Sequence, residues 1–192
     1  MTSARSLAAL VVPFLIAANL GCTAASPEPK PDTKPTASSV EMPLAPPVVY
    51  AWTDIRGRPV TTQAMAGRIT VIGFITTYDV VSQAQVRFLD RLSREHVPRV
   101  NVAVLVLEQP ENLPMVHAYV DALELPFPVA MADAPTIRGD GPFKGLHHVP
   151  AITILDRDGR ERHRHLGLLD RAALEKAVVD VEIETKVGRP PR

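Results

Sequence analysis

Two side chains that could carry chemistry lie at one predicted junction, in the stretch GFITTYDVVSQAQVRFLDRL (73–92). The stretch begins as a β-branched, buried strand and continues with the apolar spacing of a helix, so Asp79 and Ser82 fall where the helix begins. Asp79 could act as a general base or a metal ligand, whereas Ser82 is a weak nucleophile without an adjacent base. Alternatively, Asp79 caps the helix by accepting backbone N–H bonds and placing negative charge at the positive end of the helix dipole. We favour the cap, since the junction contains no cysteine and no histidine.

Histidine is the other residue type in this chain that could bind a metal or transfer protons. His163 and His165 alternate along a predicted strand, so they share one of its faces, and we expect this pair to be solvated. His96 and His117 fall within predicted helices as ordinary helix residues. The chain contains a single cysteine, so the thiolates of a soft-metal site are missing. We therefore predict no metal and no cofactor.

Alternating strands and helices must position these residues. Crossover connections come early in the chain, and a hairpin with an Asp158-Gly159 turn comes late. This order predicts an α/β fold with a mixed central sheet and helices on both faces. We expect strands at 68–76, 100–108 and 127–132, a helix from Val81, a helix at 110–123 with Met115, Tyr119 and Leu123 on one stripe, a hairpin at 151–167, and a helix at 170–184 capped by Asp170.

Composition divides the chain of 192 residues into four segments. Residues 1–21 combine one early cation with an apolar run that is too short to span a bilayer, which is typical of an export signal. Residues 22–47 are rich in proline and poor in large apolar residues, so we expect a disordered tether. Residues 48–187 are long enough for one domain, and we expect 188–192 to form a disordered tail.

The formal net charge is zero, which argues against a nucleic-acid-binding protein.

The only cysteine, Cys22, follows Gly21 directly after the apolar run. This pattern resembles the lipobox of bacterial lipoproteins, in which the cysteine is acylated and becomes the new N-terminus, although Asn19 stands where that family usually has an aliphatic residue. The alternative is ordinary cleavage after Ala25, which would discard Cys22. The resemblance implies a periplasm-facing protein of the bacterial cell envelope, held to the membrane by a lipid at Cys22. Because Thr23 replaces the Asp associated with inner-membrane retention, the outer membrane is favoured.

The predicted domain resembles a known family over nearly all of residues 48–185. The resemblance is carried by GRITVIGFITTYDVVSQAQ (67–85), FPVAMAD (127–133), HHVPAITILDRDGRERHRHLG (147–167) and the closing helix. These segments are similar to thioredoxin-like domains of the TlpA or AhpC/TSA (redoxin) type, which implies a thioredoxin-like three-layer sandwich. In that family the reactive site is Trp-Cys-x-x-Cys, at the start of the helix after the central strand, where the helix N-terminus favours a thiolate.

The reactive positions of that family are degenerate in this chain. The tryptophan position holds Tyr78, and the two cysteine positions hold Asp79 and Ser82, so both sulfurs needed for dithiol exchange are missing. The peroxidatic cysteine of peroxiredoxins would also fall on Asp79, and the proline expected ahead of it is Ile72. The resemblance therefore implies the fold of the family without its catalytic residues.

The family also places the loop before Pro150 opposite the helix start that bears Asp79. A metal carrier that uses Asp79 with His147 or His148 is therefore one alternative. In the family the matching proline is cis, and the residue before it offers backbone groups to an extended peptide. Val149 and Pro150 could keep this docking role, or Pro150 could simply shape the loop.

These observations support one leading hypothesis and two alternatives. The leading hypothesis is a redox-inactive envelope lipoprotein whose domain binds or scaffolds an unidentified envelope protein or peptide through the degenerate face. The first alternative is a thiol-disulfide oxidoreductase or peroxiredoxin-like enzyme with a non-standard site. The second alternative is the metal carrier.

Overall fold

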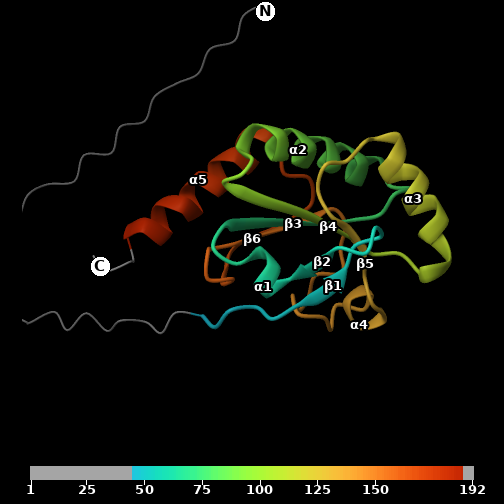
Figure 1. Ribbon diagram of the computed structural model, residues 1–192, viewed down its shortest axis with the longest axis horizontal. Helices are drawn as coiled ribbons and strands as arrows, with labels where there is room; N and C mark the ends of the chain where they lie inside the picture. The colour runs from blue at the N-terminus through green and yellow to red at the C-terminus, as the bar shows by residue number, and fades with distance from the viewer. Residues whose placement is uncertain (1–44, 188–192) are drawn as a thin grey trace, which may run out of the picture. The chain divides into compact units, whose positions relative to one another are not determined.

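A five-stranded mixed sheet forms the centre of the computed structural model, which describes residues 45–187 (Figure 1). Its strands lie in the order β5-β4-β3-β6-β7. β3, β4 and β5 are parallel, whereas β6 runs antiparallel to β3, and β7 antiparallel to β6. This arrangement confirms the predicted α/β fold with a mixed sheet. The strands are β3 Ile69–Ile75, β4 Val100–Val106, β5 Val129–Met131, β6 Ala151–Leu155 and β7 Glu161–Leu166.

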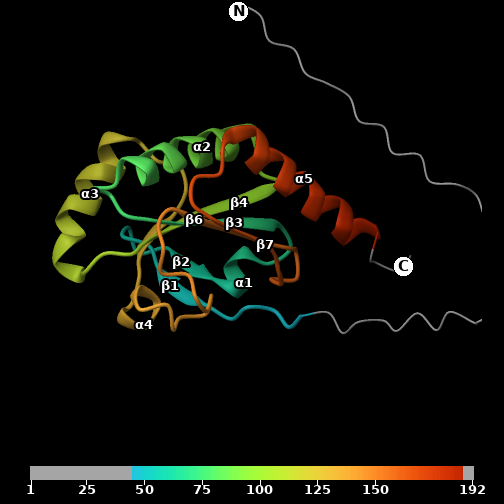
Figure 2. The ribbon, with the colours of Figure 1, turned by 180° about the vertical axis from the view of Figure 1, so that it is seen from behind.

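Three long helices cover one face of the sheet, as the two opposite views show (Figures 1 and 2). Their apolar residues recur at three- and four-residue spacing, so each helix turns an apolar stripe toward the strands. Leu89 in the first helix and Leu174 in the last are buried in the same apolar cluster as Val71 of β3. The helices are α2 Val80–His96, α3 Leu113–Ala122 and α5 Arg171–Val187.

A hairpin and two one-turn helices cover the other face. The ring of Phe143 lies 5.6 Å from that of Phe74 in β3, and the rings of Tyr50 and Trp52 stack at 4.9 Å, within a second buried cluster. The sheet is therefore the middle of three layers with helices on both faces, as predicted, although the long helices all lie on one face. The sequence analysis did not predict the elements of this second face, which are β1 Ala51–Thr53, β2 Pro59–Thr61, α1 Thr62–Met65 and α4 Ala134–Ile137.

The predicted long elements are present, and of the three residues on the predicted stripe of α3, Tyr119 and Leu123 pack against the core whereas Met115 does not. Met115 is 63 % exposed, whereas Val116 and Val120 are buried. The segment expected to be helical from residue 110 starts as a 3₁₀ turn, η1 (Pro110–Asn112), and only then continues as α3. Val116, Tyr119, Val120 and Leu123 follow the i, i+3, i+4, i+7 spacing of one helix face, and that face packs on the core.

Two predicted local features are confirmed. The Oδ1 of Asp170 accepts the Ala173 N–H at 2.9 Å and so caps α5. The Asp158-Gly159 turn joins β6 to β7, and Gly159 has a φ of 79°, a conformation that glycine adopts without a steric penalty.

The two edges of the sheet differ. At the β5 edge, Asp54 forms an isolated bridge with Ala130, and the Ile55 N–H donates to the Val129 carbonyl at 2.9 Å. The chain after β1 therefore covers that edge. β7 forms the other edge with the sequence ERHRHL, in which charged and imidazole side chains occupy five of six positions.

Several predictions concern residues that the structure does not describe. The export signal at 1–21, the tether up to residue 44 and the tail at 188–192 lie outside the described residues. Within residues 45–187, no helix combines the length and the apolar character needed to cross a membrane.

Candidate functional site

The side chain of Asp79 caps α2 at the carboxyl end of β3. Its Oδ2 accepts the Ser82 N–H at 2.7 Å, and its Oδ1 accepts the Val81 N–H at 3.3 Å. Hydrogen bonds from Ser82, first from its side chain and then from its backbone, hold the pKa of Asp79 below its usual value. A general base works best with a pKa raised toward neutrality, so this environment favours the cap over catalysis.

Ser82 and Gln83 tie the first turn of α2 to the loop that precedes it. The Ser82 side chain is fully buried, and its Oγ accepts the Thr76 N–H at 3.3 Å. The side-chain amide of Gln83 donates to the Thr77 carbonyl at 2.8 Å. Because the Ser82 hydroxyl is buried and hydrogen-bonded, it cannot reach a substrate as a nucleophile.

Glu108 holds the other side of the loop and was not among the predicted site residues. It is buried just after β4, where its Oε1 accepts the Thr77 N–H at 2.5 Å and the Thr77 hydroxyl at 2.8 Å. Its Oε2 accepts the Asn112 side-chain amide at 2.9 Å. The sequence did carry a signal for it, namely a carboxylate at the end of the strand pattern VNVAVLVLE. Parallel strands end at one edge of a sheet, so such a residue falls next to the end of β3.

Three apolar side chains project to solvent from the same loop and helix start. Tyr78 is 68 % exposed, Val80 76 % and Val81 43 %. We call these three residues the apolar patch. Since the polar groups of Asp79 and Ser82 bond within the chain, the outward surface at this end of α2 is formed largely by apolar atoms.

Val149 and Pro150 lie beside this loop. β6 pairs antiparallel to β3, with Ala151 opposite Phe74. When this register is continued by two residues past the end of the pairing, Val149 falls opposite Thr76. The Val149-Pro150 peptide bond is cis. Among residues 45–187, neither the N–H nor the carbonyl of Val149 has a hydrogen-bond partner. The register therefore places Val149 and Pro150 beside the end of β3, where the loop to Asp79 begins.

The histidines that precede Val149 do not gather a metal site around Asp79. The rings of His147 and His148 lie 4.1 Å apart, and both residues are exposed. In the described part of the chain, no group of three or more His, Cys, Asp and Glu side chains is placed to hold a metal ion. The described residues thus offer no support for the metal-carrier alternative.

His163 and His165 share a face of β7, as predicted, but the expectation that they are solvated is wrong. They pair with Ile154 and Ile152 of β6, whose side chains belong to the cluster under α5. Both histidines are half-buried because α5 packs over this part of the sheet, and the Nε2 of His163 is buried with no partner among the described residues.

We expect Asp79→Ala to lower the free energy of unfolding by about 1 kcal/mol at pH 7, and Asp79→Asn to change it little, because Asn caps a helix about as well as Asp. The depressed pKa of Asp79 means that its carboxylate stabilises the fold above the unfolded-state pKa. This contribution is lost as the pH falls through the lower native-state pKa, so Asp79→Asn should lose less stability on acidification than the wild type. Urea unfolding at pH 7 and pH 3 measures both effects, with exposed Asp140→Asn as the control. Equal unfolding midpoints for wild type and Asp79→Ala would show that Asp79 is not a cap.

Comparisons with known proteins address the fold. No protein-family model and no curated protein matches the chain. Solved structures do match it, including a thiol:disulfide interchange protein of the thioredoxin family from Chlorobium tepidum TLS. The TM-score is 0.64 at 18 % sequence identity, and the match covers 73 % of this chain and 98 % of that one.

Two further matches are exported proteins. An exposed lipoprotein thioredoxin from Streptococcus pneumoniae strain TIGR4 has a TM-score of 0.59 at 13 % identity, over 69 % of this chain and 98 % of that one. A secreted disulfide oxidoreductase from Mycobacterium tuberculosis has a TM-score of 0.57 at 16 % identity, over 69 % and 96 %. Likeness at such low identity establishes the fold and leaves the activity open. Sheet order, helix placement and these matches agree: the domain within residues 45–187 has a thioredoxin-like fold.

Proposed function

We propose that this chain is a redox-inactive, thioredoxin-like lipoprotein of the bacterial cell envelope, whose domain binds an extended segment of a partner protein. The observation that carries the proposal is the Asp79 cap. Where the resemblance places the first catalytic cysteine, a carboxylate bonds into the helix start through Val81 and Ser82. It supplies the negative charge that a thiolate would supply there, without a sulfur that could exchange.

The chemistry of dithiol exchange supports the redox-inactive part of the proposal. Exchange requires a thiolate that attacks a disulfide and a second thiol that resolves the mixed disulfide. The only cysteine of the chain is Cys22, in the predicted tether, and residues 45–187 contain none. A carboxylate at position 79 and a buried hydroxyl at position 82 cannot form the mixed disulfide.

The surface around the degenerate site supports the binding part of the proposal. An extended peptide could pair with the N–H and carbonyl of Val149, because neither has a partner within the described residues. Its side chains would then lie toward the apolar patch, where Tyr78, Val80 and Val81 stand exposed within four residues of sequence. Backbone pairing would supply affinity, and the patch would select apolar side chains.

The envelope location is supported by the sequence and by two structural neighbours. Residues 1–21 have the pattern of an export signal, and Cys22 follows a small residue as in a lipobox. The matched proteins from Streptococcus pneumoniae and Mycobacterium tuberculosis are an exposed lipoprotein and a secreted protein, respectively. We extend that location to this chain, with the outer membrane favoured by Thr23.

We expect the Cys22→Ser chain to show no insulin reduction above a heat-denatured control. Adding Asp79→Cys and Ser82→Cys should create an intramolecular disulfide and measurable insulin reduction. The Asp79 Oδ2 already reaches within 2.7 Å of the Ser82 nitrogen, and the helix N-terminus lowers a thiol pKa there. Thiol titration before and after oxidation measures the disulfide, with the single Asp79→Cys variant as its control. Insulin reduction by the chain without the new pair would overturn the redox-inactive proposal.

We expect a photo-crosslinking residue at Val80 to give a defined adduct with a partner protein in cells. The same residue at Met115, which is similarly exposed but lies on α3, serves as the matched control and should give none. Val81→Asp should abolish the Val80 adduct, because it places a charge in the apolar patch. Similar adducts from both positions, or an adduct that survives Val81→Asp, would argue against binding at this surface.

We expect a palmitate analogue to label the wild-type chain in a bacterial host and not the Cys22→Ser variant. Acylation requires the thiol of Cys22, so the label and the partition of the chain into the membrane fraction should be lost together. In-gel detection of the label after fractionation measures both. Equal labelling of the two chains would exclude a lipid at Cys22.

A further inference from the structure

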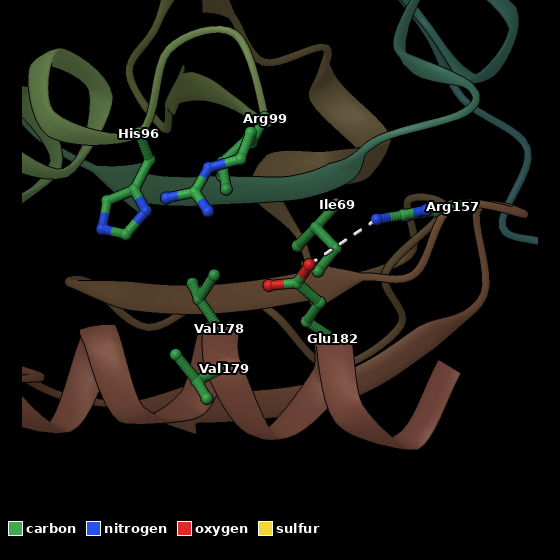
Figure 3. A pocket seen from close by; sticks show the side chains of 8 residues that line it. Ile69, His96, Arg99, Arg157, Val178, Val179 and Glu182 are labelled. Atoms are coloured by element: carbon green, nitrogen blue, oxygen red, sulfur yellow. Dashed lines mark ion pairs between the residues drawn. The ribbon is translucent and has the colours of Figure 1, made fainter. Parts of the chain in front are cut away.

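A pocket lies at the opposite end of the sheet from the candidate functional site (Figure 3). It opens where β3 and β4 begin, at Ile69 and Val100, and α5 borders it through Val178 and Glu182. The proposed binding surface does not include any of these residues. Ligand binding in this pocket would therefore not depend on the proposed function.

The floor of this pocket is apolar and its volume is small. Ile69, Val100 and Val178 all line it and are all buried. The pocket encloses about 80 Å³, which is space for roughly five water-sized groups at about 15 Å³ each. A ligand of this size has a head group and only a few carbon atoms.

Positive charge surrounds the single carboxylate of the pocket. The Oε1 of Glu182 lies 3.0 Å from the Lys186 Nζ and 3.7 Å from the Arg157 Nη2. The hydrogen bond from Lys186, and then the charges of Lys186, Arg157 and Arg99, hold the pKa of Glu182 below its usual value. The negative charge of Glu182 is thus compensated by neighbouring cations. The group of Lys186, Arg157, Arg99 and Glu182 has three positive charges and one negative charge, so its net charge is positive.

Two side chains at the pocket have no such partner. Arg99 is exposed and His96 is half-buried, and within residues 45–187 neither side chain forms a hydrogen bond or a close ion pair, so Arg99 acts on Glu182 only through its charge. Figure 3 shows the two groups side by side at the end of α2, across the pocket from Val178 and Val179. A guanidinium offers paired N–H donors that match the two oxygens of a carboxylate.

We propose that this pocket binds a small aliphatic carboxylate. The carboxylate lies against the Arg99 guanidinium beside the His96 ring, and the short hydrocarbon chain packs on Ile69, Val100 and Val178. A guanidinium alone would accept any oxyanion, but the buried apolar floor is filled only by an anion that carries a hydrocarbon chain. The expected ligand class is therefore a monocarboxylic acid of about four carbons, given the space for roughly five water-sized groups.

Butyrate is the probe that tests this assignment, added to the ¹⁵N-labelled full chain while amide resonances are followed. Saturable shifts should be confined to residues that line the pocket, with a dissociation constant in the millimolar range. Arg99→Gln should weaken binding about tenfold or more, because the variant loses the charge-assisted hydrogen bonds to the carboxylate. Arg138→Gln, at an exposed arginine directly after α4, is the matched control and should bind butyrate as the wild type does. Unchanged thermal unfolding of both variants shows that the fold is intact.

Two other probes separate the head group from the hydrocarbon chain. Butyramide, which is neutral, should produce no saturable shifts, and inorganic phosphate should bind more weakly than butyrate. Butyrate shifts that persist in Arg99→Gln, or no saturable shifts at all, would overturn the site. Phosphate binding as tight as that of butyrate would overturn the assignment to an aliphatic acid.

Discussion

The complete burial of β3 is the constraint on which the rest of the domain depends. All seven residues from Ile69 to Ile75 are buried, and the strand pairs with β4 on one side and β6 on the other. Side chains on both of its faces belong to separate apolar clusters, one under the long helices and one under the hairpin. The backbone N–H and C=O groups of such a strand are paired with the neighbouring strands. The residues that directly follow the strand leave the sheet while still buried, so their backbone groups need other hydrogen-bond partners.

The polar network after β3 meets that need. The backbone of Thr76 and Thr77 forms hydrogen bonds with the side chains of Ser82, Gln83 and Glu108. Asp79 then caps α2. In this network the side chains of Asp79, Ser82, Gln83 and Glu108 all bond to the backbone of the loop or the helix start. This explains how the fold can keep the geometry of a reactive turn without cysteines. The pocket at Ile69 lies about 20 Å away at the other end of the same strand, at about 3.3 Å per residue, so the two surfaces can bind ligands separately.

Sequence patterns predicted the parts of the domain that depend on local order. β3 and β4 appear in the sequence as near-continuous apolar runs, and Asp79 and Asp170 stand at recognisable helix starts. The three-residue strands β1 and β2 were missed, because such short segments carry no periodicity of their own.

The residues that sequence reasoning missed are defined by tertiary neighbours. Glu108 stands at the end of a strand pattern, but the sequence does not show that its partner is Thr77, which lies 31 residues away in the chain. His163 and His165 were expected in solvent because their alternation shows a shared face but does not show that α5 covers it. His96 has the appearance of an ordinary helix residue until the fold brings α5 to the opposite side of the pocket.

The structure of the two sheet edges has a consequence for the membrane-anchored arrangement that we propose. Open strands are templates for pairing with another copy, and tethering many copies to one surface raises the rate of such encounters. In this domain the β5 edge is occupied by Asp54 and Ile55, and the β7 edge carries charged side chains, among them Arg162 and Arg164. Both edges of the sheet therefore disfavour strand addition from another copy, whereas the apolar patch at the start of α2 is exposed.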